Sequence, residues 1–482
     1  MPMPVALLIL GAWTALRLIV AALTPLAPDE AYYWVWSRAL AAGYLDHPPM
    51  VALWIRAGTW IAGDTGLGVR LFSPLAAAVG SLLLARDAED LLPGRRAGFT
   101  AAALLNATLL LGAGAVIMTP DTPLLLFWTA VLTCLGRLHA TGRGVWWLAA
   151  GVAAGLALDS KYTAVLLLPA LLLWLLAVPG LRHWLRNPYP WLGGVLAAAV
   201  FAPVVWWNAQ HGWASFAKQG ARTGDWDPAR ALQFLGELFG GQFLLATPLL
   251  ALLFGAGIVL AARRGWRRDP AWTLLALLTL LPAVVFVQHA VGDRVQANWP
   301  AVLYPAAAIA AAGLAPGWQR LRGPAMALGF AVTAVAYAQA TLRPFPVPPQ
   351  LDPTTRLTGW PDLAAEVAVV AWETKARFVA VEPYGAASEL ALLLPPDLPV
   401  LGLDARWRQF NLQDAGPLVE GKAGLKLHQI HPGDPEPGVW QQMQPLRDNP
   451  PGQGGMAGDP YRVYRVSGWT GHAAMVALPR PE

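Results

Sequence analysis

The chain has 482 residues, of which 56% are hydrophobic and 13% are charged, and its net charge is +5. Soluble globular domains contain about 45–50% apolar and about 25% charged residues, so this composition indicates an integral membrane protein. The single cysteine, Cys134, excludes a disulfide scaffold and a cysteine-based zinc site, because each needs at least two thiols. The arginines lie between apolar runs and not on one soluble face, so we expect no nucleic-acid partner.

Long apolar runs recur through the first 342 residues, each close to the roughly 20 residues that a helix needs to cross a bilayer. The composition and these runs predict a mainly α, polytopic membrane protein with about eleven transmembrane helices. We expect the spans near residues 5–24, 68–92, 98–117, 123–140, 145–158, 163–179, 190–207, 240–262, 271–288, 300–317 and 324–342.

Two kinds of connection alternate between these runs. One kind carries arginines, at residues 95–96, 143, 182–186, 263–268 and 320–322. By the positive-inside rule this set and the N-terminus face the cytoplasm. The other kind contains acidic residues, prolines and aromatic residues, and we expect it to face outward at residues 25–67, 118–122, 159–162, 208–239 and 289–299.

The composition changes abruptly after residue 342. The proline-rich stretch 343–349 predicts a stiff linker, because proline clusters favour extended geometry. Beyond it, residues 362–374 have helical spacing, and residues 377–382 and 461–466 have the pattern of strands. We therefore expect a transmembrane domain over 1–342 and a small α/β extracytoplasmic domain over 343–482.

The first outward loop, residues 25–67, contains the adjacent carboxylates Asp29 and Glu30. Carboxylates directly after a membrane helix are costly to hold near hydrocarbon, so they indicate a functional site or contact with water. They could also complement the dipole of a helix that begins at Ala31, and the two interpretations are compatible. The aromatic residues at 32–36 are typical of an interfacial belt.

Five short motifs together resemble the bacterial polyprenyl-phosphate-dependent glycosyltransferases, which group protein mannosyltransferase-like enzymes with lipid A aminoarabinose and galacturonic acid transferases. The resemblance covers roughly residues 1–340. It implies the integral-membrane C-type glycosyltransferase fold, with two juxtamembrane helices in the first outer loop and an active site open to the outer face. The motifs are Asp29-Glu30, Tyr44-Leu45-Asp46-His47-Pro48-Pro49, Met118-Thr119-Pro120-Asp121-Thr122-Pro123, Ser160-Lys161-Tyr162 and Val295-Gln296-Ala297-Asn298-Trp299-Pro300.

In enzymes of this family the acidic residue that matches Asp29 is the usual catalytic candidate. A positioned carboxylate can accept the proton of a sugar hydroxyl as the bond to the anomeric carbon forms. No general acid comparable to that of a glycosidase is needed, because the leaving group is already a phosphate monoester anion. We expect Glu30 to orient the acceptor or Asp29.

The resemblance places Asp121 in the catalytic cavity, where it could orient the acceptor or share a divalent cation with Asp29. The alternative is that Asp121 only caps the following helix. The sequence has no cysteine pair and no His-x-x-x-His motif, so metal dependence stays open. The only loose candidates for ligands are Asp46, His47, His211 and His289.

Lys161 is the first candidate for contact with the donor phosphate. A lysine in an outward connection runs against the positive-inside bias, and its ammonium would offset the charge of a phosphodiester. The alternatives are an ion pair with Asp159 or snorkelling to the interface. Arg294 is a second outward cation that could share this role. The remaining candidates for the substrate cavity are Tyr33, Asp46, His47, Tyr162 and Asn298.

These observations predict an enzyme of the bacterial inner membrane with a periplasmic C-terminal domain. We expect it to transfer a sugar from a polyprenyl-phosphate carrier, its co-substrate, to a hydroxyl of lipid A, another glycan, a lipid or a protein, with inversion. The alternative is a transporter or flippase for a lipid-linked sugar, which should place ionisable residues at matching midplane positions of two halves. A receptor or structural subunit would leave the polar motifs of the loops unexplained.

Overall fold

The computed structural model describes residues 3–94, 97–221, 227–348, 351–410, 412–429, 439–449, 461–471 and 475–481. The arginines at 95–96 and the end of the proline-rich stretch therefore lie outside the described residues. The chain divides into two compact units. The first unit contains Met1–Ile19, Leu45–Val51 and Leu71–Tyr337, and the second contains Val20–Tyr44, Ala52–Arg70 and Ala338–Glu482.

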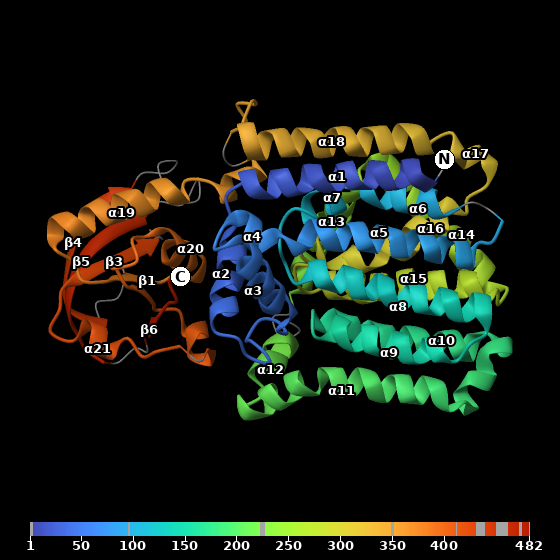
Figure 1. The fold of residues 1–482 in the computed structure, drawn as a ribbon, viewed down its shortest axis with the longest axis horizontal. Helices are drawn as coiled ribbons and strands as arrows, with labels where there is room; N and C mark the ends of the chain where they lie inside the picture. Colours follow the sequence, from blue (N-terminus) through green and yellow to red (C-terminus); the bar gives the residue numbers. More distant parts are fainter. Residues whose placement is uncertain are drawn as a thin grey trace. The chain divides into compact units, whose positions relative to one another are not determined.

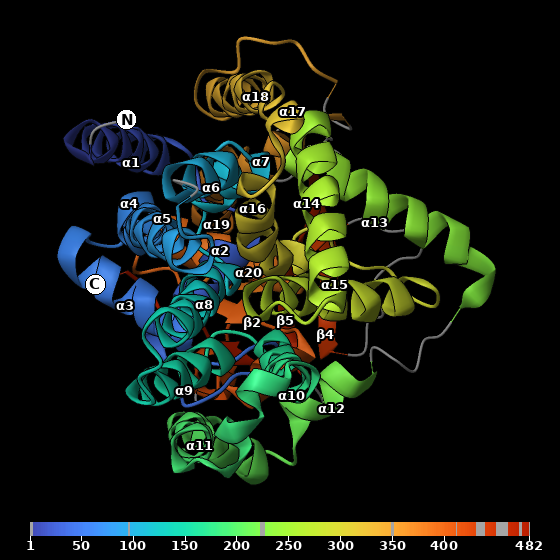
Figure 2. The same ribbon diagram turned by 90° about the vertical axis from the view of Figure 1, so that its right-hand side faces the viewer.

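The first unit is helical throughout its described part, and helices α5, α8, α9 and α11 lie side by side in that order (Figures 1 and 2). Its core is formed by leucine, alanine and tryptophan side chains such as Leu132, Trp128 and Ala308. The elements are α1 (Met3–Leu23), which continues into the second unit, α5 (Phe72–Leu91), α6 (Ala97–Asn106), α7 (Leu109–Gly114), α8 (Asp121–Thr141), α9 (Val145–Leu158), η1 (Tyr162–Leu166), α10 (Leu167–Ala177), η2 (Pro179–Arg186), α11 (Pro188–Gln210), α12 (Ala214–Ala221), η3 (Pro228–Arg230), α13 (Ala231–Ala246), α14 (Pro248–Trp266), α15 (Pro270–Ala290), η4 (Trp299–Leu303), α16 (Tyr304–Ala312), α17 (Pro316–Gln319) and α18 (Arg322–Leu342).

Small residues let helices α9 and α11 approach closely. A Cβ atom added to Gly151 would clash with the carbonyl oxygen of Gly193, and one added to Gly193 would clash with the carbonyl oxygen of Trp147. Close backbone packing of this kind is typical of membrane helices, where association depends on van der Waals contact and not on the hydrophobic effect.

The described residues contain seven helices that are long and apolar enough to cross a membrane, or eight if the bent pair Tyr162–Ala177 and Pro179–Arg186 forms one span. Shorter apolar helices accompany them at Met50–Ala62, Ala97–Asn106, Val145–Leu158 and Trp299–Ala312. The prediction of a mainly α, multi-pass membrane protein is confirmed, whereas the count of eleven spans is not.

Some of the predicted spans are interrupted. The run 98–117 breaks after Asn106, and the guanidinium of Arg17 donates to the Asn106 Oδ1 atom at 3.0 Å and to the carbonyl oxygen of Leu111 at 3.2 Å. Polar partners of this kind are required where a helix breaks inside hydrocarbon. The predicted run 240–262 contains the end of α13 and the start of α14, because Thr247 adopts a φ of 68° directly before Pro248. The prediction of one continuous span in each place was therefore wrong.

The second unit contains a six-stranded sheet in the order β4-β5-β3-β1-β2-β6. Strands β4, β5, β3 and β1 are labelled in Figure 1. Strand β1 pairs in parallel with β2 and β3, whereas β4, β5 and β6 pair antiparallel to their neighbours. The elements are α2 (Pro28–Arg38), α3 (Met50–Ala62), α4 (Gly66–Arg70), η6 (Pro353–Leu357), α19 (Trp360–Thr374), β1 (Val379–Val381), α20 (Tyr384–Leu393), β2 (Val400–Gly402), η7 (Ala405–Gln409), α21 (Gly416–Val419), β3 (Gly424–Gln429), β4 (Trp440–Asn449), β5 (Tyr461–Trp469) and β6 (Val476–Ala477).

The predicted helix at 362–374 and the strands at 377–382 and 461–466 are confirmed as α19, β1 and β5. Helices α2 and α3 lie within residues 25–67, and that they are the juxtamembrane helices of the first outer loop stays a prediction. The second unit includes two segments of that loop, and its C-terminal part begins at Ala338. A domain boundary at residue 342 stays a prediction.

Candidate active site

Three residues predicted for the site meet in the first unit, and we call Lys161, Asp121 and Asn298 the Lys161 cluster. The Lys161 Nζ atom donates to the Asp121 Oδ1 atom at 2.7 Å, and the Asn298 Nδ2 atom donates to Asp121 Oδ2 at 2.6 Å. Lys161 and Asp121 are both 8% exposed. A buried pair of this kind must balance a large desolvation cost with good geometry, so it is more informative than a surface ion pair.

Local backbone structure explains how the three side chains are presented. Asp121 is the first residue of α8, directly after Pro120. Lys161 precedes η1, where the chain leaves α9 in extended geometry, and Asn298 precedes η4. All three thus lie at helix starts. The alternative that Asp121 is only a cap is not supported, because its carboxylate contacts Lys161 and Asn298 and α8 has no side-chain cap.

The sequence offers Asp159 as an alternative partner for Lys161, but the ion pair of Lys161 is with Asp121. The backbone carbonyl of Asp159 accepts a hydrogen bond from the Met50 amide at 3.1 Å. Burial raises the pKa of the Asp159 carboxyl to about 7. Because burial disfavours the charged form, Asp159 holds its proton over much of the range below neutral pH.

A cavity of about 220 Å³ lies beside Lys161. Lys161, Tyr162 and His47 line it, as do several apolar side chains, including Val285 and Phe286. The Lys161 Nζ atom also lies 6.0 Å from the centre of the Trp299 ring, which lines the same cavity. One buried cation, the Lys161 ammonium, therefore lines a cavity whose other walls are partly apolar.

Three polar contacts join helix α12 and the segments around this cavity. Lys218 forms an ion pair with Asp46, and the Gln219 Nε2 atom donates to the Asp46 carbonyl at 2.9 Å. The Tyr162 hydroxyl lies 2.8 Å from the Ser215 Oγ atom. The motif residues Asp46 and Tyr162 thus anchor α12, and the motif residue His47 lines the cavity.

Arg294 lies apart from these contacts. Its Nε and NH2 atoms donate to the Glu237 carboxylate at 2.6 and 2.9 Å, and half of the Arg294 side chain is exposed. It does not line the cavity beside Lys161. Its assignment to the donor phosphate stays a prediction that these contacts do not support.

In the second unit, Asp29 and Glu30 have different surroundings. Glu30 is 1% exposed, and its Oε2 atom accepts from the Ala27 amide at 2.9 Å, which completes a capping box at the start of α2. Asp29 is exposed, and its Oδ1 atom accepts from the Tyr384 hydroxyl at 2.8 Å. The nearby Tyr33 is buried, with its ring centre 4.9 Å from that of Trp36.

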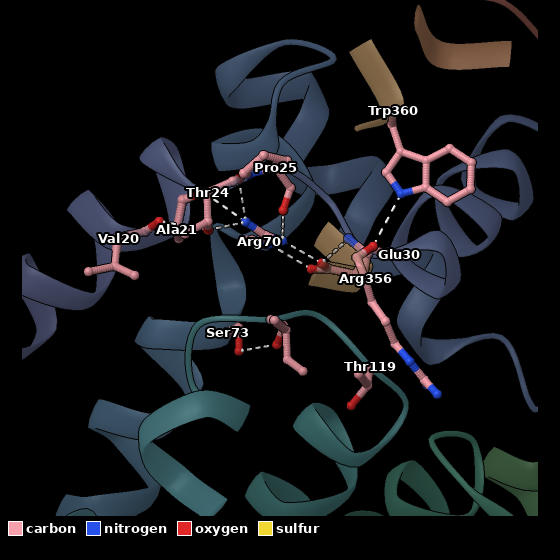
Figure 3. A network of polar contacts seen from close by, with 12 residues as sticks. Val20, Ala21, Thr24, Pro25, Glu30, Arg70, Ser73, Thr119, Arg356 and Trp360 are labelled. Atoms are coloured by element: carbon pink, nitrogen blue, oxygen red, sulfur yellow. Dashed lines mark hydrogen bonds and ion pairs between the residues drawn. The ribbon is translucent and has the colours of Figure 1, made fainter. Parts of the chain in front are cut away.

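Glu30 also belongs to a buried network with Arg70 (Figure 3). The Arg70 Nε and NH2 atoms donate to both Glu30 oxygens, at 2.7 and 2.5 Å. The same guanidinium donates to the carbonyl oxygens of Thr24 and Pro25, each at 2.8 Å. Arg70 thus fixes the end of α1 to the start of α2, and these contacts give Glu30 a structural role.

Sequence reasoning missed three residues near this network. Arg70 and Tyr384 contact the two predicted carboxylates directly. Glu389 on α20 is 2% exposed, and burial raises its pKa well above the ordinary value, a shift that Glu30 increases and Arg70 opposes. A single acid in the apolar segment 384–393 was the only available signal.

A metal shared by Asp29 and Asp121 stays a prediction. Asp121 contacts Lys161 and Asn298, and Asp29 contacts Tyr384. Within the described residues, no group of three or more histidine, cysteine, aspartate or glutamate side chains could hold a metal ion.

Comparisons with known proteins agree with the resemblance and the fold. The family described as dolichyl-phosphate-mannose-protein mannosyltransferase matches residues 46–207. The lipid A galacturonosyltransferase RgtD of Rhizobium johnstonii is 29% identical over 291 residues, which are 59% of this chain and 60% of that protein. This relative is thus matched over less than two thirds of its own length.

Two solved structures share the fold. ArnT from Cupriavidus metallidurans bound to undecaprenyl phosphate aligns with a TM-score of 0.60 and 15% identity, over 88% of this chain and 93% of that one. The apo structure of the same protein aligns with a TM-score of 0.58 and 14% identity, over 95% and 97% of the two chains. The chain is thus similar to this mannosyltransferase family over residues 46–207, is similar to a lipid A galacturonosyltransferase over 59% of its length, and shares the fold of ArnT.

Proposed function

We propose that this protein transfers a sugar from a polyprenyl-phosphate carrier to a hydroxyl of an envelope acceptor, at the outer face of the bacterial inner membrane. The observation that carries the proposal is the buried Lys161 ammonium beside a cavity of about 220 Å³ that also has apolar walls. A lipid-linked phosphate needs both features, because its charge must be offset and its chain must stay in an apolar environment.

The relatives support the kind of donor and acceptor. RgtD is named as a lipid A galacturonosyltransferase, and one ArnT structure holds undecaprenyl phosphate. We therefore propose an undecaprenyl-phosphate-linked sugar as the donor and lipid A as the first acceptor to test. Galacturonic acid is the first sugar to test.

In the proposed reaction Lys161 binds the donor phosphate. Until the donor arrives, Asp121 holds the ammonium in place, and Asn298 in turn holds the Asp121 carboxylate. Asp29 accepts the proton of the acceptor hydroxyl. The acceptor oxygen forms a bond to the anomeric carbon as the bond from that carbon to the phosphate oxygen breaks. Polyprenyl phosphate leaves as an anion, and one displacement inverts the anomeric centre.

We also propose that the N-terminus is cytoplasmic and that residues 343–482 are periplasmic, on the basis of the arginine distribution. A reporter that is active only in the periplasm, fused after residue 348, should be active. A fusion after residue 266, at the end of α14 beside the arginines at 263–268, should be inactive and serves as the matched control.

The test of the activity is transfer by the purified full chain in detergent, with undecaprenyl-phosphate-linked galacturonic acid and lipid A, read by intact mass. The Asp29→Asn variant keeps the shape of the side chain and loses the base, so transfer should fall by about 10²- to 10⁴-fold while donor binding persists. A folded Asp29→Asn protein with wild-type turnover would contradict the assignment of the base.

Two further experiments test the acceptor and the divalent cation separately. Envelope lipids from cells with and without the gene, compared by mass, identify the acceptor if lipid A is not modified in the purified system. Dialysis against EDTA, followed by addition of Mg²⁺ or Mn²⁺, decides whether a divalent cation takes part.

A further inference from the structure

Helix α20 begins beside the proposed catalytic base. It follows strand β1 after two residues, so Tyr384 lies at the carboxyl end of the parallel strands of the sheet. Strand β1 has β2 on one side and β3 on the other, and the chain runs from β1 to β2 and only later to β3. Functional residues of α/β sheets gather where the strand order reverses in this way.

The first turn of α20 is in contact with the residue that precedes Asp29. A Cβ atom added to Gly385 would lie 2.8 Å from the Cβ atom of Pro28, so only glycine permits this approach without a shift. The Tyr384 hydroxyl then reaches the Asp29 Oδ1 atom at 2.8 Å. This bond joins residues that are 355 positions apart in the chain.

The direction of the Tyr384 hydroxyl is fixed by contacts on its ring. The ring of Tyr32, which lies one turn after Asp29 on α2, meets it edge to face with centres 4.7 Å apart. The guanidinium of Arg406 lies 3.7 Å from the ring centre of Tyr384. An aromatic contact and a cation over the face together restrict the ring to one orientation.

We infer that Tyr384 is a positioning residue for the proposed reaction. By donating to Oδ1, it holds the Asp29 carboxylate in one rotamer and leaves Oδ2 to take the proton of the acceptor hydroxyl. The phenolic proton stays on Tyr384, and the proton that moves goes from the acceptor oxygen to Oδ2. The C-terminal part of the chain thus contributes a side chain to the chemical step.

This inference rests on the proposed function, and its test separates the two. Tyr384→Phe keeps the ring and its contacts and removes only the hydroxyl. We expect kcat for transfer from undecaprenyl-phosphate-linked galacturonic acid to lipid A to fall by about 5- to 30-fold, because the base is no longer held in its productive rotamer. KM for donor and acceptor should stay within about twofold, because the role inferred for the Tyr384 hydroxyl is to hold the Asp29 carboxylate and not to bind a substrate.

Tyr464→Phe is the matched control, because it removes a hydroxyl from a buried tyrosine on strand β5 of the same unit. It should leave kcat and both KM values unchanged. In the Asp29→Asn background, Tyr384→Phe should have no further effect on the residual rate, since the carboxylate that it orients is gone.

Three results would overturn the inference. One is wild-type kcat in Tyr384→Phe while Asp29→Asn is inactive, which leaves the proposed function intact. Another is a loss in Tyr384→Phe that appears in KM or in the unfolding temperature, which would make the role structural. If Tyr384→Phe fails to fold, Arg406→Gln removes the cation from the ring face, and an unchanged kcat in that variant would also reject the positioning role. Full activity of Asp29→Asn would instead reject the assigned base.

Discussion

The two polar networks differ in how closeness in the sequence relates to contact in the structure. In the first unit, Lys161 and Asn298 lie 40 and 177 positions from Asp121, yet both bind its carboxylate. In the second unit, Asp29 and Glu30 are adjacent, yet one points toward Tyr384 and the other is buried against Arg70.

Helix geometry explains the second case. Consecutive residues of an α-helix point about 100° apart, so at the start of α2 only one of two adjacent carboxylates can face the buried Arg70. Adjacent acids therefore need not share one chemical role. Distant polar residues that converge in a buried place are the stronger indication of a site, because each buried charge carries a desolvation cost.

The largest expected effect is on the Arg70 network. Arg70→Met leaves the Glu30 carboxylate buried without its cation and should lower the free energy of unfolding by about 3–5 kcal/mol. Thermal unfolding of the protein in detergent measures the loss. Arg70→Met combined with Glu30→Gln removes both charges and should recover part of it.

Asp29→Asn supplies the contrast to these variants, because it should leave the unfolding temperature unchanged and lower turnover. A Glu30→Gln protein with a wild-type unfolding temperature and turnover as low as that of Asp29→Asn would restore a catalytic role for Glu30. The distinction between the two adjacent carboxylates would then fail.

A smaller effect should separate Lys161 from Arg294. Lys161→Ala removes one charge-assisted contact with the donor phosphate, worth about 1.5–3 kcal/mol, so the affinity for undecaprenyl phosphate should fall by about 10- to 100-fold. Arg294→Ala should change that affinity by less than about twofold, because its exposed pair with Glu237 is screened by solvent.

Binding of undecaprenyl phosphate in micelles, measured by quenching of tryptophan fluorescence, gives both affinities. Equal losses in the two variants would move the donor phosphate away from the cavity beside Lys161. Arg143 lies in a connection expected on the opposite face of the membrane, so Arg143→Ala serves as the control that should leave the affinity unchanged.

Much of this arrangement could be predicted from the sequence. Apolar runs indicated most long helices, because hydropathy over about 20 residues is a strong signal. Three separate motifs each indicated one member of the Lys161 cluster. They could not indicate that Lys161 pairs with Asp121 and not with Asp159, which is nearer in sequence. The partner of Lys161 depends on how the start of α8 packs against the turn after α9.

The partners of residues 25–67 could not be predicted. Tyr384 lies 355 positions from Asp29, in a short helix whose sequence has no motif. The break at Thr247 was hidden because apolar residues flank it on both sides, so the hydropathy signal is continuous there. These features depend on tertiary contacts, which hydropathy and local propensity do not report.

The smallest predicted effect concerns Glu389. Its titration tests how well the buried part of the second unit excludes solvent. Burial raises its pKa well above the ordinary value, with Glu30 adding to the shift and Arg70 opposing it. The folded chain therefore holds a proton that the unfolded chain loses above about pH 4.3. Between the unfolded and folded pKa values, the free energy of unfolding should fall by about 1.4 kcal/mol for each unit of rising pH.

Glu389→Gln keeps the shape of the neutral side chain and cannot titrate. Its unfolding temperature should exceed that of the wild type at pH 8, and the difference should shrink as the pH falls toward about 4, where Glu389 is largely protonated in both the folded and the unfolded chain. Glu420→Gln, which changes an exposed acid of the same unit, should follow the wild type at every pH. Parallel profiles for the wild type and Glu389→Gln would mean that Glu389 is charged in the folded protein. The charged Glu389 carboxylate would then be a second anion beside Glu30 and Arg70. The surroundings of Glu30 would not be closed to solvent, so the contrast with the more accessible Asp29 would be lost.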